Sequence, residues 1–294
     1  MRHLFLHYFT KNTRFRFFVQ YGTHKEPMPL HTHDDFVELV LVLSGSADHR
    51  VNNEVYRIQK GDVFVIHHNT YHGYENPKNF RLYNIMYQPE QLQAYTDLKQ
   101  MAGFHALFVI EQYLINERAS FNSHYRLTEQ QFDKAAQVIS DMLREFMTKT
   151  PGYQTWVLAK FMELVVYLSR EYEAETAQPV TLPLANAVSY MENHFRNEIT
   201  SEQLAQISGL SLRHFTRVFK EVYQVSPIQY LISLRMEYAC TLLQTTLQSI
   251  TEVAYESGFH DSNYFSKQFK REFGITPLQY RKQRNLEWNH ERGE

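Results

Sequence analysis

Two segments about fifty residues apart carry matching polar side chains at matching spacing. If each is a helix turning ~100° per residue, basic, amide and hydroxyl groups gather on one face and aromatic groups on the other. The outer faces hold Arg213, Thr216, Arg217 and Lys220 in the first copy, and Asn263, Ser266, Lys267 and Lys270 in the second. None of these side chains is acidic, and all of them can bind phosphates or base edges in a major groove. The alternative is two helical hairpins with solvated outer faces, which the matching of turn, cap and outward chemistry disfavours.

Each outer face needs a helix, a tight turn and a second helix to position it. Gly209 and Gly258 fall where the chain must reverse, and Ala205 and Ala254 are small enough for two helices to cross closely. The side chains expected to face inward are Leu212, Phe215, Phe219, Phe265 and Phe269. Helix starts are predicted by capping boxes or by an N-cap residue followed by proline, at Thr200 with Gln203, Ser249 with Glu252, Ser226-Pro227 and Thr276-Pro277.

The two copies resemble the DNA-binding domain of the AraC/XylS transcription regulators. The segments that carry the resemblance are AQISGLSLRHFTRVFKE (residues 205–221) and ITEVAYESGFHDSNYFSKQFKREFGITPLQYR (250–281). It implies two helix-turn-helix units joined by a long helix, here about residues 227–243. The side chains expected inward on this helix are Ile228, Leu231, Ile232, Met236, Ala239 and Leu243. The two recognition helices would then enter successive major-groove faces ~34 Å apart.

The resemblance also implies a role for each outward side chain. By family position, the base contacts would come from Arg213, Thr216 and Arg217 in the first copy and from Asn263, Ser266 and Lys267 in the second. Lys220 and Lys270 lie further along their helices and are assigned to phosphate. The capped helix starts near Thr200 and Ser249 are further phosphate candidates, through their backbone amides.

A second set of chemistry-bearing residues lies in the N-terminal half. HTHDDFVELVLVLSG (31–45) supplies His31, His33 and Glu38, and GDVFVIHHNTYHGYEN (61–76) supplies His72. The spacing resembles the two cupin motifs, although His67 and Asn69 replace the usual proline and second glycine of the later motif. Three interpretations stay open: contacts to a small hydroxylated ligand, a bound divalent ion, or hydrogen bonding within the barrel.

The N-terminal half also resembles the sensor domains of rhamnose-responsive members of the AraC/XylS family, which favours the ligand interpretation. The effector implied is a small sugar such as L-rhamnose or a related sugar, with no cofactor and no metal. The candidate pocket residues are His31, His33, Glu38, His72, Tyr74 and Tyr83. Ten other histidines are interpreted as surface or packing residues: His3, His7, His24, His49, His105, His124, His194, His214, His260 and His290.

The elements that must position these groups divide the chain into three regions. Residues 1–90 read as short strands, with FVELVLVLSG ending at Gly45, and predict a small barrel. Residues 128–172 change to helical periodicity, broken at Pro151-Gly152, and their apolar stripes could form core or a dimer seam. These regions make up a sensor domain over 1–172. A polar linker is expected at 173–182 and the DNA-binding domain at 183–294.

Composition sets limits on class and location. The chain has 30 Lys+Arg against 32 Asp+Glu and one cysteine, Cys240, which is expected in the core. A disulfide framework is therefore impossible. No signal peptide and no run of ~20 apolar residues is present, so we expect a cytoplasmic protein without a membrane partner.

The expected fold class is α+β: a cupin-type β-barrel, two helices, then an all-α domain with two helix-turn-helix motifs. The expected function is a sugar-responsive transcription regulator, an activator and not an enzyme. Its expected partners are double-stranded operator DNA, a sugar effector, RNA polymerase and a second copy of the chain. The rivals are a cupin metalloenzyme with a DNA-binding appendage, and a regulator whose cupin domain only dimerises.

Overall fold

The structure is a computed structural model that describes residues 2–68, 70–93, 95, 97–110, 124–174 and 181–282. The chain divides into two compact units, residues 1–189 and 190–294. The division falls within helix α6 (Thr181–His194), a few residues beyond the predicted boundary at 183. Most of the predicted linker, and Asn69, lie outside the described residues. None of the described helices combines the length and apolar character needed to cross a bilayer.

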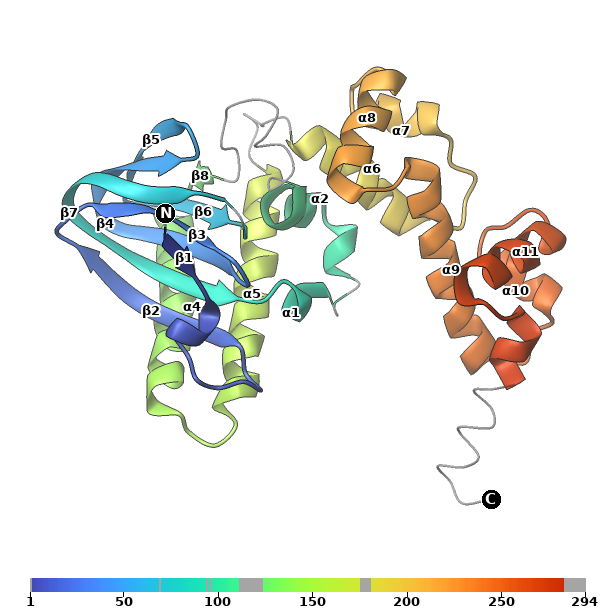
Figure 1. The fold of residues 1–294 in the computed structure, drawn as a ribbon, viewed down its shortest axis with the longest axis horizontal. Coiled ribbons are helices and arrows are strands. Elements are labelled where there is room, and N and C mark those ends of the chain that lie inside the picture. The colour runs from blue at the N-terminus through green and yellow to red at the C-terminus, as the bar shows by residue number, and fades with distance from the viewer. Residues whose placement is uncertain are drawn as a thin grey trace. The chain divides into compact units, whose positions relative to one another are not determined.

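The N-terminal unit is built on one bent, eight-stranded sheet (Figure 1). Its strands are β1 (Arg2–Leu4), β2 (Phe17–His24), β3 (Met28–His33), β4 (Val37–Val51), β5 (Glu54–Gln59), β6 (Asp62–Ile66), β7 (His72–Tyr87) and β8 (His124–Arg126). The long strands β4 and β7 pair antiparallel from Val37–Tyr87 to Val51–His72. β4 also pairs with β5 and β6, and β7 also pairs with β2 and β3.

The sheet folds over in the middle of β4 and β7. The β4–β7 register shifts between Val42 and Asp48, which bends both strands and separates the sheet into two halves. Gly45 lies at this bend with φ +72°, and a Cβ there would come within 2.2 Å of the carbonyl oxygens of Lys78 and Asn79. Only glycine fits this close approach. Among the described residues no strand pairing closes the sheet into a ring, so the predicted barrel is an open, folded-over sheet.

Helices α4 (Glu129–Thr148) and α5 (Tyr153–Ala174) pack together along the half of the sheet that contains β2 (Figure 1). The short helix α1 (Glu90–Gln93) follows β7, and α2 (Ala102–His105) packs against α5. Short 3₁₀ turns occur at Leu6–Tyr8 and Leu98–Gln100, and a π-helical turn at Ala106–Ile110 follows α2. Two of the helices, α4 and α5, match the pair predicted from periodicity, with the break where Pro151-Gly152 predicts it.

The apolar stripes of α4 and α5 pack inside the unit. Phe161 on α5 is fully buried, and its ring lies 5.2 Å from Phe17 and 4.7 Å from Tyr87, measured between centroids. On α4, Phe146 packs edge-on against Phe18 at 5.6 Å. These contacts place the stripes in the core, which was one of the two alternatives.

The C-terminal unit consists of short helices around one long helix (Figure 1). They are the end of α6, α7 (Ser201–Ile207), α8 (Leu212–Tyr223), α9 (Pro227–Thr245), α10 (Ile250–Glu256), α11 (Ser262–Phe273) and a last helix over 277–282. α7 and α8 pack at the start of α9, and α10 and α11 pack at its end. This arrangement is the predicted pair of helix-turn-helix motifs joined by a long helix.

Three of the expected core positions differ in the structure. Leu212 and Ile228 are each 40% exposed, because each lies in the first turn of its helix, where the neighbouring helix does not reach. Cys240 is partly buried and packs against the core of the second motif. Apart from Ile228, the predicted inward residues of α9 are buried or pack against that core.

Candidate effector pocket and DNA-binding surface

The turns of the two helix-turn-helix copies have the same backbone geometry. Gly209 and Gly258 both adopt left-handed conformations, with φ +62° and +90°. The carbonyls of Ala205 and Ala254 each accept a hydrogen bond of 3.0 Å from the amide five residues further on. Both alanines are buried, which lets the two helices of each copy approach closely.

The second helix of each copy is held by an equivalent aromatic cluster. The centroids of Phe215 and Phe219 lie 5.6 Å apart, and those of Phe265 and Phe269 also lie 5.6 Å apart. All four rings are fully buried. This packing fixes which face of each helix turns inward and leaves the polar faces outside.

The outward faces of α8 and α11 are accessible, as the periodicity predicts. Thr216 and Ser266 are half-buried, and the remaining predicted DNA contacts on these helices are exposed: Arg213, Arg217, Lys220, Asn263, Lys267 and Lys270. The two faces differ at one further position. In α8, Arg217 Nη1 donates to the Glu221 carboxylate at 3.0 and 3.2 Å. In α11, the position equivalent to Glu221 holds Arg271, so the carboxylate is replaced by a guanidinium.

Capping hydrogen bonds form at both helix starts that were predicted to bind phosphate. Thr200 Oγ1 accepts from the Gln203 amide at 3.2 Å, but the Gln203 side chain donates to Tyr190, so only half of the predicted box forms. Ser249 forms the complete box with Glu252, whose carboxylate accepts from the Ser249 amide at 2.7 Å. The Ser249 amide is therefore already bonded to an acidic side chain, and its contact to phosphate stays a prediction.

A small pocket lies between the two halves of the folded sheet. Its volume is about 60 Å³. It is lined by Leu4, Phe9, Gln20, His24, Met28, His31, His33, Glu38, His72, Tyr74, Asn84 and Met86. Phe9, Gln20, His24 and Met28 are only partly buried, so they mark the side from which a ligand can enter.

Tyr83 is the one predicted pocket residue that does not line this pocket. It alternates with Asn84 along β7, and Asn84 points into the pocket, so Tyr83 lies on the other face of the sheet. Its ring packs beside Tyr21, with centroids 6.1 Å apart. The other five predicted residues are all brought together.

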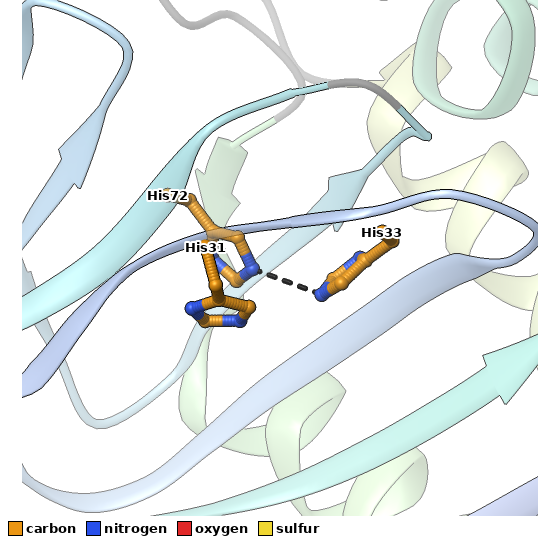
Figure 2. A group of neighbouring side chains, drawn as sticks. All are labelled: His31, His33 and His72. Carbon is orange, nitrogen blue, oxygen red and sulfur yellow. Dashed lines mark hydrogen bonds between the residues drawn. The ribbon is translucent and has the colours of Figure 1, made fainter. Parts of the chain in front are cut away.

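Three of these residues point their imidazole rings toward one another (Figure 2). His31 and His33 come from β3 and His72 from β7; all are buried, and one nitrogen of each lies within 4.8 Å of the others. His72 Nε2 lies 3.1 Å from His33 Nε2, the contact drawn in Figure 2. On its other side, His72 Nδ1 lies 3.3 Å from His49 Nε2.

Burial makes these imidazoles neutral. Desolvation lowers the pKa of His33 and His49 to about 3, and that of His72 well below its usual value. Burial also raises the pKa of Glu38 to about 7, although hydrogen bonding to Asn84 opposes this. Glu38 Oε2 lies 3.5 Å from His72 Nε2. Because the His72 imidazole is neutral, this contact is not an ion pair.

Several buried polar atoms at the pocket have no hydrogen-bond partner among the described residues. They are Glu38 Oε2, His33 Nδ1, Tyr74 OH and Asn84 Oδ1. An unsatisfied buried polar group costs on the order of 1–3 kcal/mol. The arrangement therefore favours a bound polar or charged group that satisfies these atoms.

Besides the apolar lining, sequence reasoning missed four polar residues at or beside the pocket: Gln20, His24, His49 and Asn84. His24 and His49 are both predicted as surface or packing residues. His49 is fully buried and packs against Phe64 and Tyr74, as a packing residue would, but it also lies beside His72. His24 lines the pocket, which the prediction did not include.

The sequence did not place His49 because the predicted strand ended at Gly45, whereas β4 continues through the bend to Val51. Strict alternation from Glu38, Val40 and Val42 would put His49 on the opposite face. The bulges between Val42 and Asp48 shift this parity, so that Ala47, His49 and Val51 are buried instead.

Comparison with known proteins matches both units. The family model of the AraC-like ligand binding domain matches residues 17–143, and that of a helix-turn-helix domain matches residues 204–283.

Curated relatives match over most of the chain. The chain is 32% identical over 256 residues to the HTH-type transcriptional activator RhaS of Enterobacter sp. (strain 638), covering 86% of this chain and 87% of that protein. It is 31% identical over 255 residues to the HTH-type transcriptional activator RhaR of Escherichia coli (strain K12), covering 85% and 86%. These relatives are transcriptional activators and not enzymes. The chain belongs to the AraC/XylS family of DNA-binding transcription regulators.

Proposed function

We propose that this regulator activates transcription when a small sugar, such as L-rhamnose or a related sugar, occupies the pocket of the N-terminal unit. The observation that carries the proposal is the buried pocket between the half-sheets, with unpartnered polar atoms on Glu38, Tyr74 and Asn84. Sugar hydroxyls would satisfy these atoms, and the Tyr74 ring suits the apolar face of a sugar. The similarity to RhaS and RhaR supports the same class of effector.

The size of the pocket gives the proposal a mechanism. A volume of about 60 Å³ is well below the roughly 150 Å³ of a cavity that admits benzene, so a sugar fits only when side chains at the entrance move. The partly buried Phe9, Gln20, His24 and Met28 are the lining residues best able to do so. A ligand that binds only the opened form shifts the population toward that form, and this differential affinity is the source of regulation.

The DNA-binding side of the proposal rests on α8 and α11. Arg213 and Arg217 suit guanine, and Asn263 suits adenine, with Thr216, Ser266 and Lys267 adding further base contacts. Lys220 and Lys270 would bind phosphate, as would the helix starts near Thr200 and Ser249. We further infer that the regulator acts as a homodimer, contacts RNA polymerase and works in the cytoplasm where promoter DNA lies.

A thermal-shift experiment on the full chain tests the sugar. At ~100 times its dissociation constant an effector adds about 2.7 kcal/mol to the free energy of unfolding, so one sugar of a panel should raise the melting temperature clearly. Tyr74→Phe, which removes only the hydroxyl, should reduce this shift, and the matched control Tyr83→Phe on the opposite face should keep it. If no sugar shifts the protein, the interpretation of the domain as a dimerisation module gains support.

A double substitution tests the recognition faces. Arg217→Ala with Lys267→Ala should weaken binding to a selected operator by about 1–3 kcal/mol per base contact. The matched control is Lys160→Ala with Arg144→Ala, which removes one half-buried and one exposed charge from the N-terminal unit. Fluorescence anisotropy at fixed salt measures both. Unchanged specific affinity in the Arg217/Lys267 variant would show that the faces are assigned wrongly.

A further inference from the structure

The loop that follows α6 connects the two helix-turn-helix motifs. Residues 195–197 lead from α6 toward α7 of the first motif, yet they form hydrogen bonds with α9 and with the second motif. We propose that Arg196 and Arg235 are positioning residues, which hold the two recognition helices at a fixed orientation for simultaneous contact with DNA. The inference rests on the proposed function, because it requires α8 and α11 both to contact DNA.

The start of this loop is fixed to the first motif. At the end of α6, Tyr190 OH accepts a hydrogen bond of 2.9 Å from Gln203 of α7. Glu192 accepts from the Tyr230 hydroxyl at 2.6 Å, and the Tyr230 ring packs edge-on against Phe219 of α8, with centroids 5.6 Å apart. A movement of the first motif therefore carries the loop with it.

Arg235 joins the loop to the middle of α9 and to the second motif. Its Nε donates to the Phe195 carbonyl at 2.7 Å, and its Nη2 donates to the Asn197 carbonyl at 2.8 Å. The guanidinium carbon lies 5.9 Å from the centroid of Phe259, a ring in the core of the second motif. A guanidinium suits this role because its donors spread in one plane while its face contacts an aromatic ring.

Arg196 makes a second connection, directly to the end of α10. Its Nε donates to the Glu256 carbonyl at 3.0 Å, and its guanidinium carbon lies 5.4 Å from the centroid of Tyr238 on α9. Tyr238 OH in turn donates to the Glu256 carboxylate at 3.4 Å. Glu256, the last residue of α10, is therefore held from the loop and from α9.

The loop backbone also packs against the turn of the second motif. A Cβ on Gly258 would lie 2.9 Å from the Cα and the carbonyl oxygen of Arg196, and 3.0 Å from Arg235 Nε. A Cβ on the equivalent Gly209 would meet no described atom within 4 Å. The loop thus supports the second turn alone, although both turns have the same backbone geometry. A link between the motifs explains this difference, whereas the internal repeat does not.

A connection beside α9 restricts how the motifs can move. They pack at opposite ends of this helix (Figure 1), so bending of the helix or rotation about its axis changes the angle between α8 and α11. A second link, displaced from the axis, opposes both motions. Less conformational entropy is then lost when both faces contact DNA, which raises the affinity for correctly spaced segments.

The rival explanation is that the two arginines only stabilise the helical domain. Their loss would then lower the folded fraction and weaken binding to every DNA by the same factor. Positioning predicts instead that the loss is confined to DNA on which both motifs bind at once.

The test compares four DNAs by fluorescence anisotropy with the full chain at fixed salt. They are one operator selected from random DNA, two forms in which one contacted segment is scrambled, and one form with a base pair inserted between the segments. The insertion turns one segment by roughly 34° relative to the other, because B-DNA makes a turn in about 10–10.5 bp. We expect the unaltered chain to bind each altered form more than about 10-fold more weakly.

Arg196→Lys with Arg235→Lys keeps both positive charges but removes both planar guanidinium groups. This variant should bind the intact operator about 10-fold more weakly, yet bind each scrambled form within roughly 2-fold of the unaltered chain. The insertion should now cost less than about 3-fold in affinity, because the angle between the motifs is no longer fixed. The matched control Arg170→Lys, at an exposed arginine of the N-terminal unit, should bind all four DNAs as the unaltered chain does.

A second variant keeps the test decisive if the double variant does not fold. Arg196→Met alters a side chain that is 52% exposed, so it should fold, which circular dichroism checks. Its lost charge weakens binding to intact and scrambled DNA alike. Positioning predicts a further loss of roughly 3-fold on the intact operator only.

The outcomes separate this inference from the proposed function. If scrambling either segment leaves the affinity of the unaltered chain unchanged, the motifs do not both contact the operator, and the proposed recognition faces fail together with the inference. If both segments matter but the folded variants lose the same factor on all four DNAs, or keep the full effect of the insertion, positioning by these arginines is overturned and the recognition faces stand.

Discussion

In both helix-turn-helix copies a pair of phenylalanines four residues apart is fully buried, and the ring centroids lie 5.6 Å apart in each. On the outer faces, by contrast, Arg213 corresponds to Asn263, and Glu221 corresponds to Arg271. The interior is repeated because one turn geometry needs one kind of packing. The exterior is not repeated, as expected if each copy reads a different DNA segment.

The two copies also differ in how a shared tyrosine is anchored. Tyr230 OH donates to the Glu192 carboxylate at 2.6 Å, and burial together with this carboxylate raises the pKa of Tyr230. In the second copy, Tyr280 OH accepts from Gln244 at 2.8 Å. The first copy is thus tied to α6 and the second to α9. Equivalent residues have acquired different partners outside the shared interior.

The largest expected effect tests whether the interiors are energetically equivalent. Phe219→Ala and Phe269→Ala should each lower the free energy of unfolding by about 3–5 kcal/mol, because each removes a fully buried ring. Urea unfolding of the full chain measures both, with Phe273→Ala, at 40% exposure, as the milder control. If the two losses of unfolding free energy differed by more than about 2 kcal/mol, the two interiors would not be energetically equivalent.

A smaller effect should separate the two turns. Gly209→Ala has open space around its Cβ, so its cost is the left-handed conformation alone, about 1–2 kcal/mol. At Gly258 a Cβ would lie 2.9 Å from the Cα and the carbonyl oxygen of Arg196, which adds roughly 1–3 kcal/mol of overpacking. Thermal unfolding should therefore rank Gly258→Ala as the less stable variant, and the opposite order would refute the packing argument.

The smallest expected effect concerns the outer faces. Glu221→Gln removes an exposed partner of Arg217, a type of pair worth about 0.3–0.5 kcal/mol, and also removes a negative charge from the DNA side. Operator affinity should rise slightly. The matched change Arg271→Gln in the second copy should lower it. If anisotropy titrations showed that both substitutions raise or both lower operator affinity, the two faces would not contact DNA in the same way.

The C-terminal unit could be predicted from sequence more completely than the N-terminal one. Its helices are local structures with explicit start signals, such as Ser249 with Glu252, and the repeat checks each assignment against a second copy. Two of the errors there, Leu212 and Ile228, are single first-turn positions where periodicity cannot tell how far a neighbouring helix extends.

In the N-terminal unit the decisive contacts are between strands distant in sequence. The pairing of β4 with β7 and the bend at Gly45 determine which residues reach the pocket, and neither follows from local periodicity. The motif spacing did identify His31, His33, Glu38 and His72. It could not identify Asn84 or His24, which belong to the pocket only because β7 and β2 pair across from the motif strands.

The continuous helix α9 has a consequence for how such a protein can diverge. It runs unbroken from Pro227 to Thr245, and its 19 residues span roughly 28 Å at ~1.5 Å each. Inserting one residue would lengthen it little but would rotate one motif by ~100° relative to the other, and only about seven residues, close to two full turns, would restore the orientation. We therefore expect operators to vary in base sequence while the spacing between the two DNA segments contacted by the motifs stays fixed.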